Sequence, residues 1–226
     1  MSHADAHADA PQQDAAEFWE SRYAGVDRAW SGRVNQVLAD VARGLPPGRA
    51  LELGCGEGAD AIWLAEQGWQ VTAVDISPTA IARGAAAAEE AGIAPGRIQW
   101  HAHDLATWAA ASRSTAAGGA CYDLVSANFL QSPVELPRAA ILRRAADLVA
   151  PGGHLLVVSH AGFPPWSTHR HEQVLPTPEQ EIQMLALPPR EWEVLVAEIR
   201  SREATGPQGE RATLDDSVVL LRRREQ

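Results

Sequence analysis

The apolar positions of the chain follow two periods in turn, one typical of strands and one typical of helices. Short runs of consecutive apolar residues, such as those within 50–53 and 154–159, have the length and composition of buried strands. Longer segments between them, such as 136–150, repeat apolar residues every three or four positions. This alternation predicts an α/β protein with a parallel sheet that helices cover on both faces.

Individual elements can be placed from these periods together with the proline and glycine positions. The predicted strands are 50–53, 70–74, 97–101, 122–127 and 154–159. The predicted helices are 32–44, 60–67, 78–91 and 136–150, preceded by one that begins at Asp14, an aspartate with a glutamate three residues further on. Glycines or prolines close most of these helices, as expected at helix ends.

The pattern changes after residue 160. A proline-rich segment leads to a short predicted helix near 178–185, and two β-rich runs, 191–199 and 213–222, lie close enough to form an antiparallel hairpin. The expected fold is therefore a doubly wound, mostly parallel seven-stranded sheet with a C-terminal antiparallel hairpin. We expect residues 1–13 to be a disordered tail and 14–226 a single domain, because no repeat or internal linker divides them.

Composition and charge exclude several kinds of function. All 19 basic residues are arginine, so neither a lysine Schiff base nor a phosphate-loop lysine is possible. The net charge of −10 argues against a nucleic-acid partner. No stretch is apolar enough to span a membrane or to act as a secretion signal. Cys55 and Cys121 are too few for a disulfide framework or a cysteine metal site, which favours the reducing cytoplasm, and we expect no metal.

The most informative segment is glycine-rich and joins the first predicted strand to the next helix. It contains Gly54, Gly56 and Gly58, and glycines at such a turn let the backbone approach a ligand closely. Asp75 ends the following strand, where a carboxylate can accept both hydroxyls of a ribose. The spacing Gly-x-Gly-x-x-Ala also satisfies the fingerprint of dinucleotide sites, so a nicotinamide-dependent (NAD) oxidoreductase is an alternative.

Three features favour an adenosyl ligand with a cationic tail instead. Glu52 precedes the first glycine by two residues, where its carboxylate would repel a pyrophosphate and attract an ammonium or sulfonium group. Asp104 follows the third strand, where it could bind an adenine amino group. The predicted antiparallel hairpin is also foreign to a plain dinucleotide-binding fold.

Several motifs occur in an order that resembles one family. They are Glu52-Leu-Gly-Cys-Gly-Glu-Gly58, Val74-Asp-Ile-Ser77, His103-Asp-Leu105, Tyr122-Asp-Leu-Val125 and Leu148-Val-Ala-Pro-Gly-Gly153. This set resembles the class I S-adenosylmethionine-dependent methyltransferases, which have a Rossmann-like fold. The N-terminal segment 18–23 and Trp30 are similar to the thiopurine- and tellurite-type small-molecule enzymes of that superfamily.

The resemblance implies roles for residues that match these motifs. Glu52 and Gly54 would lie at the methionine amino group, and Cys55, Gly56 and Gly58 would form the loop under the cofactor. Asp75 would hold the ribose, Ile76 would pack on the adenine, and Asp104 with the Leu105 N–H would bind the adenine edge. Asn128 would lie near the methyl group and the acceptor. Trp30, in an N-terminal loop, could fold over the cofactor.

The expected reaction is in-line transfer of a methyl group to a small-molecule sulfur, oxygen, nitrogen or chalcogen acceptor. A neutral acceptor needs a general base, and the candidates His160, His169 and His171 follow the fifth strand. Trp166 could cover the acceptor. Ser-Ala-Asn-Phe after the fourth strand differs from the motif of enzymes that methylate DNA amines. A non-catalytic S-adenosylmethionine-binding protein is a second alternative, and the acceptor and the oligomeric state stay open.

Overall fold

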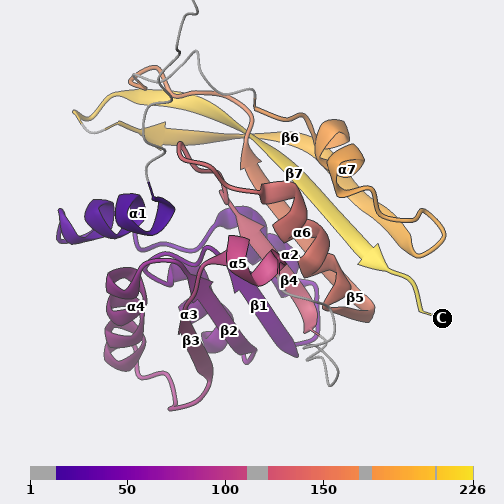
Figure 1. Cartoon of the computed structure of the whole chain (residues 1–226), viewed down its shortest axis with the longest axis horizontal. Coiled ribbons are helices and arrows are strands. Elements are labelled where there is room, and N and C mark those ends of the chain that lie inside the picture. Colours follow the sequence, from indigo (N-terminus) through magenta and orange to yellow (C-terminus); the bar gives the residue numbers. More distant parts are fainter. Residues whose placement is uncertain (1–13, 111–121, 168–174, 207, 226) are drawn as a thin grey trace, which may run out of the picture.

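Seven strands form one mixed sheet in a computed structural model that describes residues 14–110, 122–167, 175–206 and 208–225. The strands are β1 (Arg49–Leu53), β2 (Gln70–Asp75), β3 (Ile98–Ala102), β4 (Tyr122–Asn128), β5 (Val149–His160), β6 (Trp192–Thr205) and β7 (Arg211–Arg223). Their order across the sheet is β3-β2-β1-β4-β5-β7-β6, and β7 runs in the direction opposite to that of the other six strands (Figure 1). The predicted sheet and its hairpin are confirmed, whereas the expected tail 1–13 lies outside the described residues.

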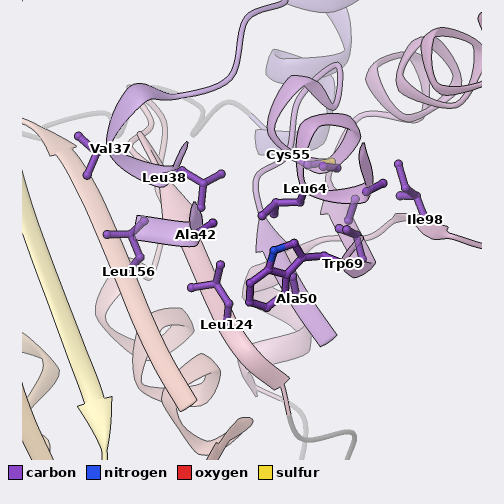
Figure 2. Close-up of a cluster of buried hydrophobic side chains, with 14 of the residues drawn as sticks. Val37, Leu38, Ala42, Ala50, Cys55, Leu64, Trp69, Ile98, Leu124 and Leu156 are labelled. Atoms are coloured by element: carbon purple, nitrogen blue, oxygen red, sulfur yellow. The ribbon is translucent and has the colours of Figure 1, made fainter. Parts of the chain in front are cut away.

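Helices cover both faces of the sheet (Figure 1). They are α1 (Ala15–Ala24), α2 (Gln36–Arg43), α3 (Ala59–Glu66), α4 (Pro78–Glu90), α5 (Leu105–Ala110), α6 (Arg138–Asp147) and α7 (Pro178–Leu185). On one face, α2, α3 and α4 pack against a core that includes Leu64, Trp69 and Leu124 (Figure 2). On the other face, α5, α6 and α7 pack against a core that includes Val125 and Leu155.

Several predicted boundaries were wrong, including the end of β6, which lies at Thr205 rather than 199. β5 begins at Val149 rather than 154, because Tyr122 pairs with Val149 and an irregularity in the register accommodates the Pro-Gly-Gly segment within the strand. The helix expected to continue to 150 therefore ends at Asp147. The helix expected from residue 32 begins at Gln36, because the side chain of Asn35 accepts hydrogen bonds from the first-turn N–H groups.

The short helix α5 was not predicted. Asp104 creates its N-terminus, since one carboxylate oxygen accepts from the N–H of Ala106 at 2.8 Å and the other from the hydroxyl of Thr107 at 2.9 Å. Among the described residues no helix has both the length and the apolar character needed to cross a membrane.

The first helix reaches the edge of the sheet where the parallel strands end. Glu20 of α1 accepts hydrogen bonds from Ser77 and Thr79 at the start of α4, and the indole N–H of Trp19 donates to Ser132 Oγ, 3.2 Å away, in the β4–α6 connection. The order of the strands reverses between β1 and β4, so this edge holds the crevice where ligands bind in open α/β sheets.

Candidate cofactor site

The glycine-rich loop between β1 and α3 is tied to the end of β2. Gly54, Gly56 and Gly58 have φ angles of 69°, 54° and 78°, which side chains with a Cβ rarely adopt. The N–H groups of Gly54 and Cys55 both donate to the Val74 carbonyl, at 2.8 and 3.0 Å. These two hydrogen bonds hold the start of the loop against the carboxyl end of β2, next to that of β1.

Asp75 fastens the same loop from β2. One of its carboxylate oxygens accepts the N–H of Gly56 at 2.8 Å, and the other accepts the N–H of Ser77 at 3.0 Å. Burial raises the pKa of Asp75 despite these backbone hydrogen bonds. Each carboxylate oxygen can accept more than one hydrogen bond, so Asp75 retains capacity for a ligand hydroxyl.

Glu52 of β1 is a buried carboxylate whose Oε2 has no hydrogen-bond partner within the described part of the chain. Burial, followed by the nearby negative charges of Asp60 and Asp75, raises its pKa well above the usual range. A buried carboxylate oxygen without a partner destabilises the fold, because it has lost its hydrogen bonds to water and forms no hydrogen bond to the protein in their place. The arrangement is thus suited to a cation that enters from outside.

Asn128 and Asp60 complete this acceptor-rich region. Asn128 ends β4 and donates its amide N–H to Asp60 at 2.8 Å, which leaves its Oδ1 buried and, among the described residues, unpartnered. The N–H of Asn35 donates to the other oxygen of Asp60 at 2.6 Å, and burial raises the pKa of this acid. In the described chain, no cluster of three or more His, Cys, Asp or Glu side chains is placed to hold a metal ion.

The segment between α1 and α2 covers the glycine loop. The indole N–H of Trp30 donates to the Tyr23 hydroxyl at 3.0 Å, and a Cβ added at Gly56 would lie 3.1 Å from each of these two polar atoms. Glu57 holds the segment by accepting the N–H groups of Ala29 and Trp30, and it also pairs with Arg83 at 3.0 Å. Trp30 stays 46% exposed, so one side of its ring faces outward.

The predicted adenine-binding residues lie at the ends of β2 and β3. Ile76 is half-buried, Leu105 is buried, and both oxygens of Asp104 already cap α5. Leu105 also lines a cavity of about 440 Å³ that follows the sheet face covered by α5, and neither Ile76 nor Asp104 is among its lining residues. Leu53, Val74 and His103 line it toward the carboxyl ends of the strands, and Thr72, Tyr122 and Leu148 line it further along the sheet.

Cys55, although it lies within the loop, is not poised as a nucleophile. Its side chain is buried, and burial with the neighbouring carboxylates raises the pKa of the thiol well above its ordinary value. Since the thiolate is the reactive form, Cys55 serves here as a small buried side chain.

The predicted acceptor-side residues are not all brought together. His160 ends β5 and stacks on Phe129, the residue after Asn128. Trp166 instead packs against Gly206 near the turn of the β6–β7 hairpin, where an added Cβ would lie 2.8 Å from its ring. His169 and His171 lie outside the described residues.

Sequence reasoning missed Asp60, Tyr23 and Asp216 as site residues. Asp60 resembled an ordinary acid in the first turn of a helix, and the position of Tyr23 depends on how α1 packs. Asp216 stands beside Asp215 ahead of the apolar run of a predicted strand, so no local pattern distinguishes it from its neighbour.

Comparison with protein-family models matches residues 19–196 to the methyltransferase domain family. The chain belongs to this methyltransferase family. The match includes every strand of the parallel part of the sheet and the glycine loop, and it confirms the resemblance inferred from the sequence motifs.

Individual methyltransferases resemble the chain at different lengths. A 2-heptyl-1-hydroxyquinolin-4(1H)-one methyltransferase of Mycobacteroides abscessus is 31% identical over 133 residues, which is 58% of this chain and only 55% of that enzyme. A probable thiol methyltransferase of Arabidopsis thaliana is 28% identical over 72% of this chain and 73% of its own length. The N-methyltransferase NodS of Bradyrhizobium japonicum, solved with S-adenosyl-L-homocysteine, shares the fold with a TM-score of 0.64 at 20% identity, covering 94% of this chain and all of NodS.

Proposed function

We propose that this chain binds S-adenosylmethionine across the carboxyl ends of β1, β2 and β4 and transfers its methyl group to a small-molecule acceptor by in-line displacement. The single observation that carries the proposal is Glu52 Oε2, a buried carboxylate oxygen without a hydrogen-bond partner among the described residues. An ammonium group bound there would partner this oxygen and offset the neighbouring negative charges.

The other site residues fit the remaining parts of the same ligand. Asn128 Oδ1 offers a second acceptor near Glu52, on the neighbouring strand. Asp75 can accept ribose hydroxyls, and the glycine loop leaves room for close backbone approach. Trp30 and Tyr23 cover the loop from the N-terminal side. When bound, S-adenosylmethionine supplies an electrophilic methyl carbon on a sulfonium.

A dinucleotide fits this site poorly. Its pyrophosphate would lie at the glycine loop, close to the carboxylates of Glu52, Asp60 and Asp75. In a water-excluded site, like charges repel strongly. Burial already disfavours the charged forms of these acids, so a bound cation, which stabilises the carboxylates, is favoured here over the phosphates of a nicotinamide cofactor, which would oppose their ionisation further.

The acceptor is proposed as a small molecule. The names of the relatives indicate a hydroxyquinolone and a thiol as acceptors of those enzymes. The net charge of −10 disfavours a nucleic acid here as well. The cytoplasmic location expected from the cysteines stays a prediction.

Two measurements test the proposal. Isothermal titration calorimetry with S-adenosylhomocysteine and, separately, with NADH should show binding of the first and none of the second at equal concentration. Transfer of a labelled methyl group to a panel of small thiols, phenols and N-hydroxy compounds should give product. Binding of NADH alone would support the oxidoreductase, and binding of S-adenosylhomocysteine with no transfer across the panel would support a non-catalytic binding protein.

A further inference from the structure

A histidine and a buried aspartate face each other where β5 ends. His160 and Asp216 are partners in the antiparallel register of β5 and β7. The Asp216 side chain is only 3% exposed, and its Oδ1 lies 3.6 Å from His160 Nδ1, too far for a hydrogen bond. Within the described chain this oxygen has no hydrogen-bond partner, although it is buried. His160 is 42% exposed, so its ring also reaches solvent.

Contacts on two sides hold this pair. Arg202 of β6 donates its Nε–H to the other oxygen of Asp216 at 2.6 Å, which fixes the carboxylate. The imidazole stacks on the ring of Phe129, with centroids 4.2 Å apart and planes 19° from parallel. The guanidinium of Arg202 lies 5.4 Å from the same phenyl ring. The His160 ring thus lies against Phe129 with Nδ1 on the side of Asp216.

The backbone places this cluster next to the methyl-transfer position. Phe129 has a φ of 54°, a conformation that is rare for a bulky residue and that tends to persist at functional sites. It directly follows Asn128, and its N–H donates to the Val158 carbonyl at 2.7 Å. Gln131 Oε1 accepts the N–H of His160 at 2.8 Å. The ends of β4 and β5 are thus locked together beside the proposed site.

We infer that Asp216 is a positioning residue that orients His160 as a general base, and that the acceptor is a neutral hydroxyl or N-hydroxyl group. The inference rests on the proposed function. The negative charge of Asp216, 3.6 Å from Nδ1, favours the tautomer with its proton on Nδ1, which leaves the lone pair of Nε2 free to accept a proton from an acceptor. An acceptor that is already an anion, such as hydrosulfide, needs no such base, so the pair favours the oxygen acceptor of the two classes that the relatives suggest.

The step balances as follows. The acceptor O–H gives its proton to His160 Nε2 while an oxygen lone pair forms the bond to the methyl carbon. The carbon–sulfur bond breaks at the same time, and its electron pair stays on sulfur as a thioether. Asp216 stabilises the imidazolium that results, and the exposed side of His160 passes the proton to water.

Two charged groups lie on the β7 and β6 side of His160: Asp216 and, paired with it, Arg202. The neighbouring acid Asp215 is exposed and accepts a hydrogen bond from the Ser201 hydroxyl at 2.6 Å, away from His160. Asp215 is therefore a matched control for Asp216.

The test compares two acceptors in wild type and in Asp216→Asn, with Asp215→Asn as the matched control. With 2-heptyl-1-hydroxyquinolin-4(1H)-one, Asp216→Asn should lower kcat by about 100-fold, the lower end of what a positioned base contributes, with little change in KM. With hydrosulfide the rate should stay within twofold. If Asp216→Asn folds poorly, Arg202→Gln replaces it in the test, because the Arg202 side chain is partly exposed. Arg202→Gln should lower kcat for the same acceptor by a smaller factor.

A second readout does not depend on turnover. Nitrogen NMR of the wild-type protein should show the neutral His160 imidazole with its proton on Nδ1. Asp216→Asn should increase the share of the tautomer protonated on Nε2, whereas Asp215→Asn should not. A wild-type His160 protonated on Nε2, an Asp216→Asn enzyme with unchanged kcat, or methyl transfer confined to hydrosulfide would overturn the inference. If the wild-type protein does not bind S-adenosylhomocysteine at all, the proposed function itself is overturned.

Discussion

The carboxylate of Glu20 accepts a hydrogen bond from the hydroxyl of Ser77 at 2.5 Å, which joins the N-terminal helix α1 to the start of α4. The N–H of the same serine donates to Asp75, and Asp75 in turn accepts the N–H of Gly56. A continuous set of hydrogen bonds thus connects helix α1 with Asp75, the acid proposed to bind the ribose, and with the glycine loop. Docking of α1 and binding of the cofactor should therefore depend on each other.

The docking of α1 should weaken on acidification. Hydrogen bonds from Ser77 and then Thr79 lower the pKa of Glu20, so the stabilisation is complete at neutral pH and is lost as pH falls through that lowered pKa. Glu20→Gln should weaken docking at neutral pH and remove its pH dependence. Hydrogen exchange of α1 amides across pH measures this, and Glu17→Gln, an exposed acid on the same helix, is the control. Equal exchange rates in the wild type, Glu20→Gln and Glu17→Gln would contradict the role of Glu20 in docking α1.

Gly56→Ala should abolish cofactor binding more than its loss of stability explains. The new Cβ would lie 3.1 Å from the polar atoms of Tyr23 and Trp30, and the left-handed backbone adds about 1–2 kcal/mol of strain. Gly92→Ala is the matched control, because Gly92 has a φ of 73° but no atoms within 4 Å of such a Cβ. Both variants should lower Tm, and only Gly56→Ala should lose S-adenosylhomocysteine affinity in calorimetry. If the two variants bind S-adenosylhomocysteine with similar affinity, the packing of Tyr23 and Trp30 against Gly56 does not matter for cofactor binding.

Asp75→Ala should weaken S-adenosylhomocysteine binding by about 10- to 100-fold, since hydrogen bonds to a charged group contribute about 1.5–3 kcal/mol. The variant removes the acceptor for ribose and also releases Gly56 and Ser77. Asp40→Ala, an exposed acid on α2 that pairs with Arg43, should bind like the wild type. An Asp75→Ala protein with unchanged affinity would exclude the ribose assignment.

The buried ion pair between Arg138 and Glu181 should be the most sensitive point for stability. Glu181 is fully buried and accepts from Arg138 at 2.6 Å and from the Ser159 hydroxyl at 2.6 Å. Arg138 also donates to the Leu130 carbonyl, which holds the loop after β4. Glu181→Ala should cost about 3–5 kcal/mol in urea unfolding, because it leaves a buried charge without its partner. The double variant Arg138→Met, Glu181→Leu should recover much of this loss, and a double variant as unstable as the single one would contradict the explanation.

Elements with a strong local signal could be predicted from the sequence. Consecutive apolar residues and glycine turns located the parallel strands, and the loop residues Glu52, Gly54 and Gly56 came together because they are adjacent in the chain. Asp75 joined them because parallel strands end at one edge of the sheet. The start of β5 could not be predicted, since Pro-Gly-Gly ordinarily ends an element and here only the pairing with Tyr122 places it in a strand.

The unpredicted parts of the site depend on contacts between distant segments. Asp60 meets Asn128 across 68 positions, and Glu20 meets Ser77 across 57. Asp216 reaches His160 only through the register of β5 and β7, which no local pattern specifies. Periodicity identifies which residues are buried, but it does not identify which buried polar groups face each other.

The most direct test measures whether the Glu52 carboxylate binds an ammonium group. The dissociation constants of S-adenosylhomocysteine and of its analogue without the α-amino group are compared in wild type and in Glu52→Gln. The wild type should bind the analogue about 10- to 100-fold more weakly, as expected for a charge-assisted hydrogen bond, and Glu52→Gln should distinguish the two ligands far less. An equal loss in both proteins would show that the amino group binds elsewhere and would contradict the account.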